Sequence, residues 1–172
     1  MVSSLCSLIR FSANYGSDVK SLAAVILRRN ISYTATDSQD IANQDNNANL
    51  WKRLSPDGQN FVKTELLKVI SQTQDKAIVH KICNLLIEVG GTIYEQENFV
   101  WQDLLNILFQ FVNSEEDLKV DAALQIFNGL FSYLMDHLVK FKADLMGIFS
   151  KTLQHASLDI NLAALQAVSN FL

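Results

Sequence analysis

The amino-acid sequence predicts an all-α fold, an α–α superhelix of about four stacked antiparallel helix pairs. Three observations support this prediction. Apolar residues recur at helical spacing along nearly the whole chain. The 172 residues include only six glycines and one proline, Pro56, which is a sparse supply of turn formers for a strand-rich fold. A similar helical core also recurs along the chain at a nearly constant interval.

The helical spacing is clearest in three stripes of apolar residues. One runs from Val62 to Ile70, a second from Val100 to Phe111 and a third from Leu134 to Phe149. Each stripe covers one face of a 3.6-residue helix. With the remaining periodic segments, they predict eight helices, at residues 2–13, 17–31, 56–72, 75–89, 98–112, 115–132, 135–154 and 157–172.

Start and stop signals set the expected ends of these helices. Ser55-Pro56-Asp57 supplies a capping hydroxyl, a proline at the first helical position and an acid in the first turn. Ser114 with Glu115, Glu116 and Asp117 is a capping-box pattern, and Ser157 with Asp159 is a weaker one. Gly90-Gly91 predicts a helix end, since glycine readily adopts the left-handed conformation. The expected break near Tyr133 has no Gly or Pro to mark it.

Residues 32–54 differ from the rest of the chain. They are rich in Asn, Asp, Gln, Ser and Thr, and they predict a long exposed loop inserted between the second and third helices.

A repeat is visible in every second helix, where Ala23, Cys83, Ala122 and Ala163 occupy similar positions. The last three follow one another at roughly the period of 40–47 residues that is typical of HEAT and armadillo helix pairs. The first interval is longer because it contains the inserted loop. The alternative is a generic helical bundle that contains alanines. The register favours one HEAT-type segment at 1–172, with repeats at 2–31, 56–89, 98–132 and 135–172.

Composition excludes several classes of function. The net charge is −4, and no basic stripe of the kind that binds nucleic acid is present. Two cysteines do not make a disulfide framework, so we expect a reducing compartment. The start, Met1 to Arg10, lacks the charged and apolar regions of a secretory signal. No window approaches eighteen uninterrupted apolar residues, so we expect no membrane insertion.

The sequence also offers little for catalysis, and we expect no enzyme, cofactor or metal site. Clustered glycines for phosphate binding and a GxSxG motif are both missing. His80 and Cys83 could share a helix face, but a lone Cys of this kind is more often a small core residue. Acidic residues near Trp101 and at 115–117 lie at expected helix starts, where they complement the dipole. The phenylalanines mostly follow the apolar stripes, which favours core over base stacking.

The run Leu22-Ala23-Ala24-Val25-Ile26-Leu27-Arg28-Arg29 resembles the second helix of the importin-β (karyopherin-β) family. Segments 54–67 and 79–89 are similar to the second HEAT repeat of the importins that carry ribosomal proteins and histones. Segments from Trp101 to Phe109 and from Leu118 to Phe127 are similar to the third. The resemblance covers essentially the whole chain.

The resemblance implies a nuclear transport receptor that shuttles between cytoplasm and nucleus. Its implied partners are Ran-GTP, cargo proteins and nucleoporins. In this family the amino-terminal repeats bind Ran-GTP through the second, concave-facing helix of each repeat, and that binding releases the cargo. The residues carried over are polar positions on those helices: Lys20, Arg28, Arg29, Lys81, Asn84, Glu88, Asp121, Gln125 and Asn128. For Arg28 and Arg29, stabilisation of a helix C-terminus is the competing interpretation.

Two departures from the family pattern stand beside this hypothesis. The first expected helix is shorter than the family's, and the last helical pattern has no cap at Leu172. We therefore expect a segment of a larger array. The alternative function is a HEAT scaffold or regulatory subunit for a phosphatase, a kinase or a tubulin complex, because fold alone does not decide function.

Overall fold

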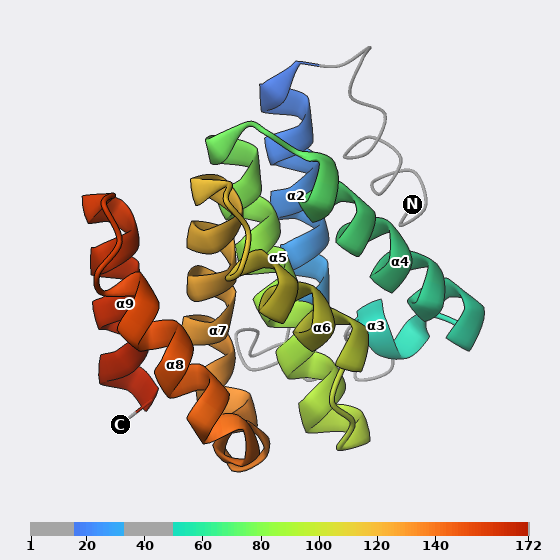
Figure 1. Ribbon diagram of the computed structural model, residues 1–172. Coiled ribbons are helices and arrows are strands. Elements are labelled where there is room, and N and C mark those ends of the chain that lie inside the picture. The colour runs from blue at the N-terminus through green and yellow to red at the C-terminus, as the bar shows by residue number, and fades with distance from the viewer. Residues whose placement is uncertain (1–15, 33–49, 172) are drawn as a thin grey trace, which may run out of the picture. The chain divides into compact units, whose positions relative to one another are not determined.

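The computed structural model describes residues 16–32 and 50–171, and every regular element among them is helical (Figure 1). The all-α prediction is confirmed. The expected helix at 2–13 lies outside the described residues. The helices are α2 (Ser17–Ser32), α3 (Leu50–Arg53), α4 (Pro56–Gln72), α5 (Lys76–Glu97), α6 (Gln102–Phe111), α7 (Asp117–Leu138), the short 3-10 helix η2 (Val139–Phe141), α8 (Lys142–Thr152) and α9 (Leu158–Phe171).

The chain forms two compact units, Met1–Thr92 and Ile93–Leu172, whose boundary falls within α5. In the first unit, α2 buries Ala23, Ala24 and Leu27 along one face. The four-residue helix α3 contacts α2 and buries Trp51, whose backbone carbonyl accepts a hydrogen bond from Gln59 Nε2 of α4 at 3.1 Å. Helix α3, which is a single turn, is thereby fixed to both α2 and α4.

The predicted start of α4 is confirmed in detail. Ser55 precedes the helix in an extended conformation, and its Oγ accepts a hydrogen bond from the Gly58 N–H at 3.2 Å. Pro56 opens the helix, and Asp57 lies in the first turn. A serine cap of this kind satisfies one of the otherwise unpaired N–H groups at a helix N-terminus.

In the second unit, α7 packs against α6 and α9, and α8 packs against α9. Phenylalanines from all four helices and η2 form its centre. Phe131 of α7 has ring-centroid distances of 6.3 Å to Phe127, 6.3 Å to Phe149 and 5.3 Å to Phe171. Phe109 extends the cluster toward Phe127 at 5.5 Å and Phe141 at 5.7 Å.

The second unit contains two successive helix pairs. Helix α6 begins at Gln102 and α8 begins at Lys142, whereas α7 begins at Asp117 and α9 begins at Leu158. Both spacings are close to the helix-pair period of roughly 40 residues that defines the HEAT and armadillo class.

The predicted helix end at Gly90-Gly91 is wrong. Helix α5 continues through both glycines, which are buried, and ends at Glu97. The residue in the left-handed conformation is instead Asn98, with φ of 48°, and its N–H bonds the Tyr94 carbonyl at 2.9 Å. Asparagine is the commonest substitute for glycine at this position, so the helix end is encoded two turns later than expected.

The predicted break near Tyr133 is also wrong. Helix α7 runs on to Leu138, and the chain turns through η2 before α8 begins at Lys142. Leu134 and Leu138 are buried and extend the core-facing stripe of α7. The apolar stripe from Leu134 to Phe149 therefore belongs to two helices, which sequence periodicity alone did not separate.

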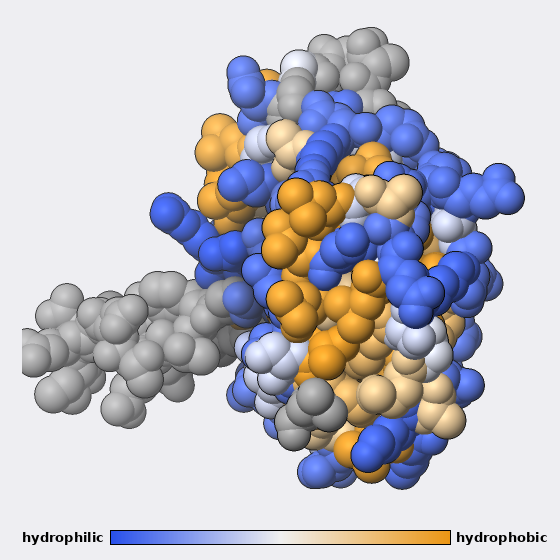
Figure 2. Space-filling model, turned by 60° about the vertical axis from the view of Figure 1, so that its left-hand side comes forward, coloured by the Kyte–Doolittle hydropathy of each residue, from blue (hydrophilic) through white to orange (hydrophobic). Residues whose placement is uncertain are grey.

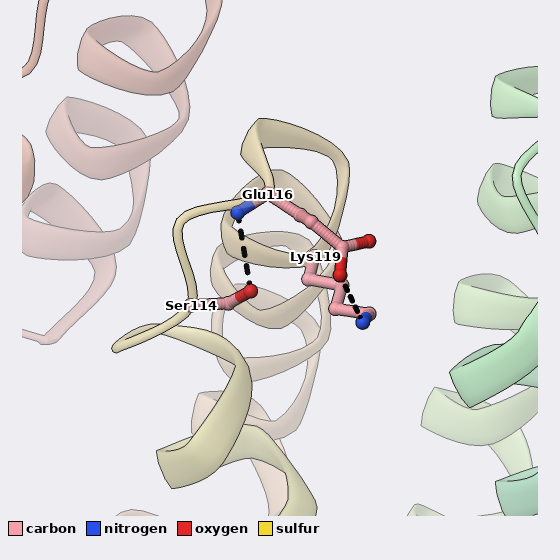
Figure 3. Close-up of polar contacts among 3 residues, drawn as sticks. All are labelled: Ser114, Glu116 and Lys119. Atoms are coloured by element: carbon pink, nitrogen blue, oxygen red, sulfur yellow. Dashed lines mark hydrogen bonds and ion pairs between the residues drawn. The ribbon is translucent and has the colours of Figure 1, made fainter.

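The capping box expected at Ser114 does not form. Helix α7 starts at Asp117, and Ser114 Oγ accepts the N–H of Glu116 at 3.1 Å, two residues ahead, in a local turn (Figure 3). Lys119 holds the corner by donating to Glu116 Oε1 at 2.5 Å, and its Nζ lies 5.9 Å from the centroid of the Phe111 ring.

The loop predicted at 32–54 is wrong at both ends. Ser32 is the last residue of α2, and Leu50–Arg53 forms α3 because Trp51 anchors that turn in the core. Residues 33–49 lie outside the described part of the chain.

We predict that Phe131→Ala lowers the free energy of unfolding by about 3–5 kcal/mol, because a buried aromatic ring is replaced by a cavity. Urea unfolding followed by circular dichroism measures the change. Phe99→Ala is the matched control, since Phe99 is 52% exposed and its loss should have little effect. Equal effects of the two substitutions would contradict the central role of Phe131.

We predict that Asn98→Gly keeps or raises stability, whereas Asn98→Val lowers it by about 1–2 kcal/mol, because a β-branched residue is strained at positive φ. The midpoint of thermal unfolding reports the difference. Asn60→Val, on the exposed surface of α4, controls for the change of residue type. Similar shifts for Asn98→Val and Asn60→Val would show that the helix end tolerates valine.

Candidate partner-binding surface

The nine residues carried over from the resemblance lie on α2, α5 and α7. On α2 they differ in setting. Arg28 and Arg29 are exposed, whereas Lys20 is partly buried and shares its helix face with the buried Ala24 and Leu27, four and seven residues later. Of these three cations, Arg28 and Arg29 are therefore more accessible to a partner than Lys20.

On α5, the three residues share one face of the helix. Lys81, Asn84 and Glu88 are spaced at i, i+3 and i+7. Lys81 is exposed, and Asn84 and Glu88 are half-buried. They form a narrow polar line beside the buried residues Ile82, Cys83 and Leu86.

On α7, Asp121, Gln125 and Asn128 likewise fall at i, i+4 and i+7, and all three are half-buried. Asn128 reaches α9, where Asn170 Nδ2 donates to Asn128 Oδ1 at 2.6 Å. Sequence reasoning missed Asn170. The available signal was the spacing from Asn128 to Asn170, which nearly equals one repeat and so places the two asparagines at equivalent positions of successive helix pairs.

Helix α9 also has an exposed apolar edge. Leu158, Leu162 and Leu165, at i, i+4 and i+7, are 69%, 51% and 56% exposed. Figure 2 shows hydrophobic surface running along this side of the molecule. This row of exposed leucines is an apolar surface on which another apolar face could pack.

The second unit also has a pocket of about 390 Å³ between α6 and α8. Phe109 and Ile148 contribute apolar surface, and Asp144 and Lys151 are its only charged lining residues. His80 is half-buried on α5 and Cys83 is fully buried. Among the residues that the structure describes, no three His, Cys, Asp or Glu side chains gather as metal ligands. The helices of these same residues include none that is long and apolar enough to cross a membrane.

The stacked antiparallel helix pairs with a period near 40 define an α-solenoid, a class of protein that binds partners along extended surfaces. A family model described as "IPO5-like, TPR repeats" matches residues 74–172, which is more than half of the chain. The chain belongs to this importin-β-like family. Proteins of this kind are generally non-enzymatic and act through protein partners. The matched description names TPR repeats, whereas the observed period is closer to that of HEAT repeats.

We predict that Asn128 and Asn170 stabilise the α7–α9 pair through their mutual hydrogen bond. Asn128→Ala and Asn170→Ala, alone and combined, should give a coupling of about 0.5–1 kcal/mol in a double-mutant cycle, the range of one net hydrogen bond. Urea unfolding provides the four free energies. Asn128→Ala combined with Asn106→Ala, on α6, should be additive, and an additive Asn128/Asn170 pair would contradict the contact.

Proposed function

We propose that this chain is the amino-terminal part of a nuclear transport receptor, and that it binds Ran-GTP and contributes to the import of cargo. The family match carries this proposal. Further support comes from the exposed or half-buried polar residues that line α5 and α7, where a partner could reach them. Cargo proteins and nucleoporins are the other proposed partners, and the receptor shuttles between cytoplasm and nucleus.

Within the family, we propose the subgroup that carries ribosomal proteins and histones, on the similarity of segments 54–67 and 101–127. The Ran-binding residues in this proposal are the eight polar positions that face outward or lie half-buried: Arg28, Arg29, Lys81, Asn84, Glu88, Asp121, Gln125 and Asn128. Lys20 belongs to the same proposal but shares its helix face with core residues, so we assign it a smaller contribution.

We also propose that residues 1–172 form one segment of a longer helical array. The support is the leucine edge of α9. A helix pair stacked on Leu158, Leu162 and Leu165 would bury the same kind of surface that α7 buries against α9. Each repeat in a solenoid covers the apolar face of its neighbour in this way.

We predict that the chain binds immobilised Ran loaded with GTP and binds Ran loaded with GDP far more weakly. Lys81→Glu should weaken the GTP-dependent binding about fivefold to tenfold, because it reverses a charge at the proposed interface. Biolayer interferometry gives the dissociation constants. Lys63→Glu, on α4, reverses a charge outside the proposed surface and is the matched control.

Equal binding to the two forms of Ran, or no binding, would contradict the proposal. It would favour the alternative, a helical scaffold for a different protein complex. A loss of affinity that is the same for Lys81→Glu and Lys63→Glu would reject the residue assignment while leaving GTP-dependent binding in place.

A further inference from the structure

The first unit carries a cluster of positive charge, and the proposed Ran contacts include only Arg28 and Arg29 of its four members. Arg28 and Arg29 lie in the last two turns of α2, and Lys52 and Arg53 lie in α3. All four side chains are exposed. Helix α3 contacts α2 and lies beside its carboxyl-terminal end in Figure 1. We call these four residues the basic cluster.

No member of the basic cluster forms an ion pair or a side-chain hydrogen bond within the described part of the chain. Asp57, the next carboxylate after Arg53 along the sequence, lies in the first turn of α4 and forms no ion pair with it. Exposed charges of one sign on two contacting helices favour a partner of the opposite charge.

Helix-terminus stabilisation accounts for only part of the basic cluster. Arg29 lies in the last turn of α2, where a cation is favoured by the helix dipole. Helix α3 is a single turn and so has almost no macrodipole. Interaction with a helix dipole therefore does not explain Lys52 and Arg53. Their turn is nevertheless fixed, since Trp51 is buried and its carbonyl is bonded to Gln59.

An apolar line on α2 leads into the basic cluster. Val19, Leu22 and Ile26 are 41%, 60% and 37% exposed. Arg29 follows Leu22 by seven residues and Ile26 by three, so it continues the same helix face. The surface therefore presents hydrophobic side chains first and positive charge beyond them.

From this surface we infer that α2 and α3 bind an acidic amphipathic helix of a partner protein, with its apolar residues on Leu22 and Ile26 and its carboxylates on the basic cluster. Two observations favour a protein segment over a nucleic acid or a membrane. The exposed side chains of the described parts of α2 and α3 include no aromatic ring on which a base could stack. Helix α2 also buries Ala23, Ala24 and Leu27 in the core, unlike a helix free to enter a lipid interface.

The proposed peptide site shares Arg28 and Arg29 with the proposed Ran contacts, but Lys52, Arg53 and the apolar line on α2 belong to the peptide site alone. The inference predicts that the full chain binds a fluorescein-labelled helical peptide with leucines on one face followed by four glutamates. Fluorescence anisotropy measures the affinity. Raising the salt concentration from about 0.1 M to about 0.5 M should weaken this binding severalfold, because the Debye length falls well below about 10 Å.

Three variants locate the site. Lys52→Glu combined with Arg53→Glu should weaken peptide binding by about tenfold or more, since two attractive contacts become repulsive. Leu22→Ser should weaken it about threefold or more, because Leu22 is expected to bury apolar surface against the peptide. Lys63→Glu should leave it unchanged. Circular dichroism of each variant tests whether it remains folded, and both altered sites are exposed, so the fold should be retained.

Several results would overturn the inference. They are equal affinity for a peptide with four glutamines in place of the glutamates, no effect of the Lys52/Arg53 double reversal, or an equal effect of Lys63→Glu. Tighter binding to a 16-nucleotide oligothymidylate or to phosphatidylserine vesicles would assign the surface to a nucleic acid or a membrane instead. Lys81→Glu should weaken Ran-GTP binding and leave peptide binding unchanged, so failure of one proposal is distinguishable from failure of the other.

Discussion

The contacts of the Phe131 ring are the interaction on which the second unit depends. This residue joins Phe127 on its own helix to Phe149 of α8 and Phe171 of α9, and Phe127 in turn meets Phe109 of α6. A single amphipathic helix pair cannot bury its apolar face alone, so each repeat requires its neighbour. The rings fill the space where four helices meet, and Gln125 and Asn128 of α7 are half-buried.

Helical periodicity predicted most of this core because the physical signal is local. Val62, Leu66 and Val69 recur at i, i+4 and i+7, and the structure has a helix there that buries all three. The joints between helices were predicted less well. Ser55-Pro56 predicts a helix start, because serine is a favoured N-cap and proline is favoured at the first helical position. The turn at η2 has neither glycine nor proline. It forms because Leu138 and Leu145 must both reach the core from helices of different direction.

At Gly90 and Gly91 the sequence has glycines that are typical of a helix end, but the helix continues through them. Glycine lowers helix stability by about 1 kcal/mol relative to alanine, so a pair of glycines normally predicts a helix end. Tertiary packing outweighs that local cost here, since both glycines are buried within α5. Asn98 is the residue that accepts positive φ. A sequence shows which residues tolerate a helix end, but burial decides which of them becomes one.

The candidate surface was less accessible to sequence reasoning, because it depends on contacts between distant residues. Helical phase placed Asp121, Gln125 and Asn128 on one face of α7, where all three are half-buried. It could not show that Lys20 shares a helix face with core residues, and it could not find Asn170 or associate Lys52 and Arg53 with α2. Those associations arise only when α9 packs on α7 and α3 packs on α2. The packing that buries the apolar stripes therefore also decides which polar side chains lie near one another on the surface. A partner binds charged and amide side chains whose spacing is determined by the core.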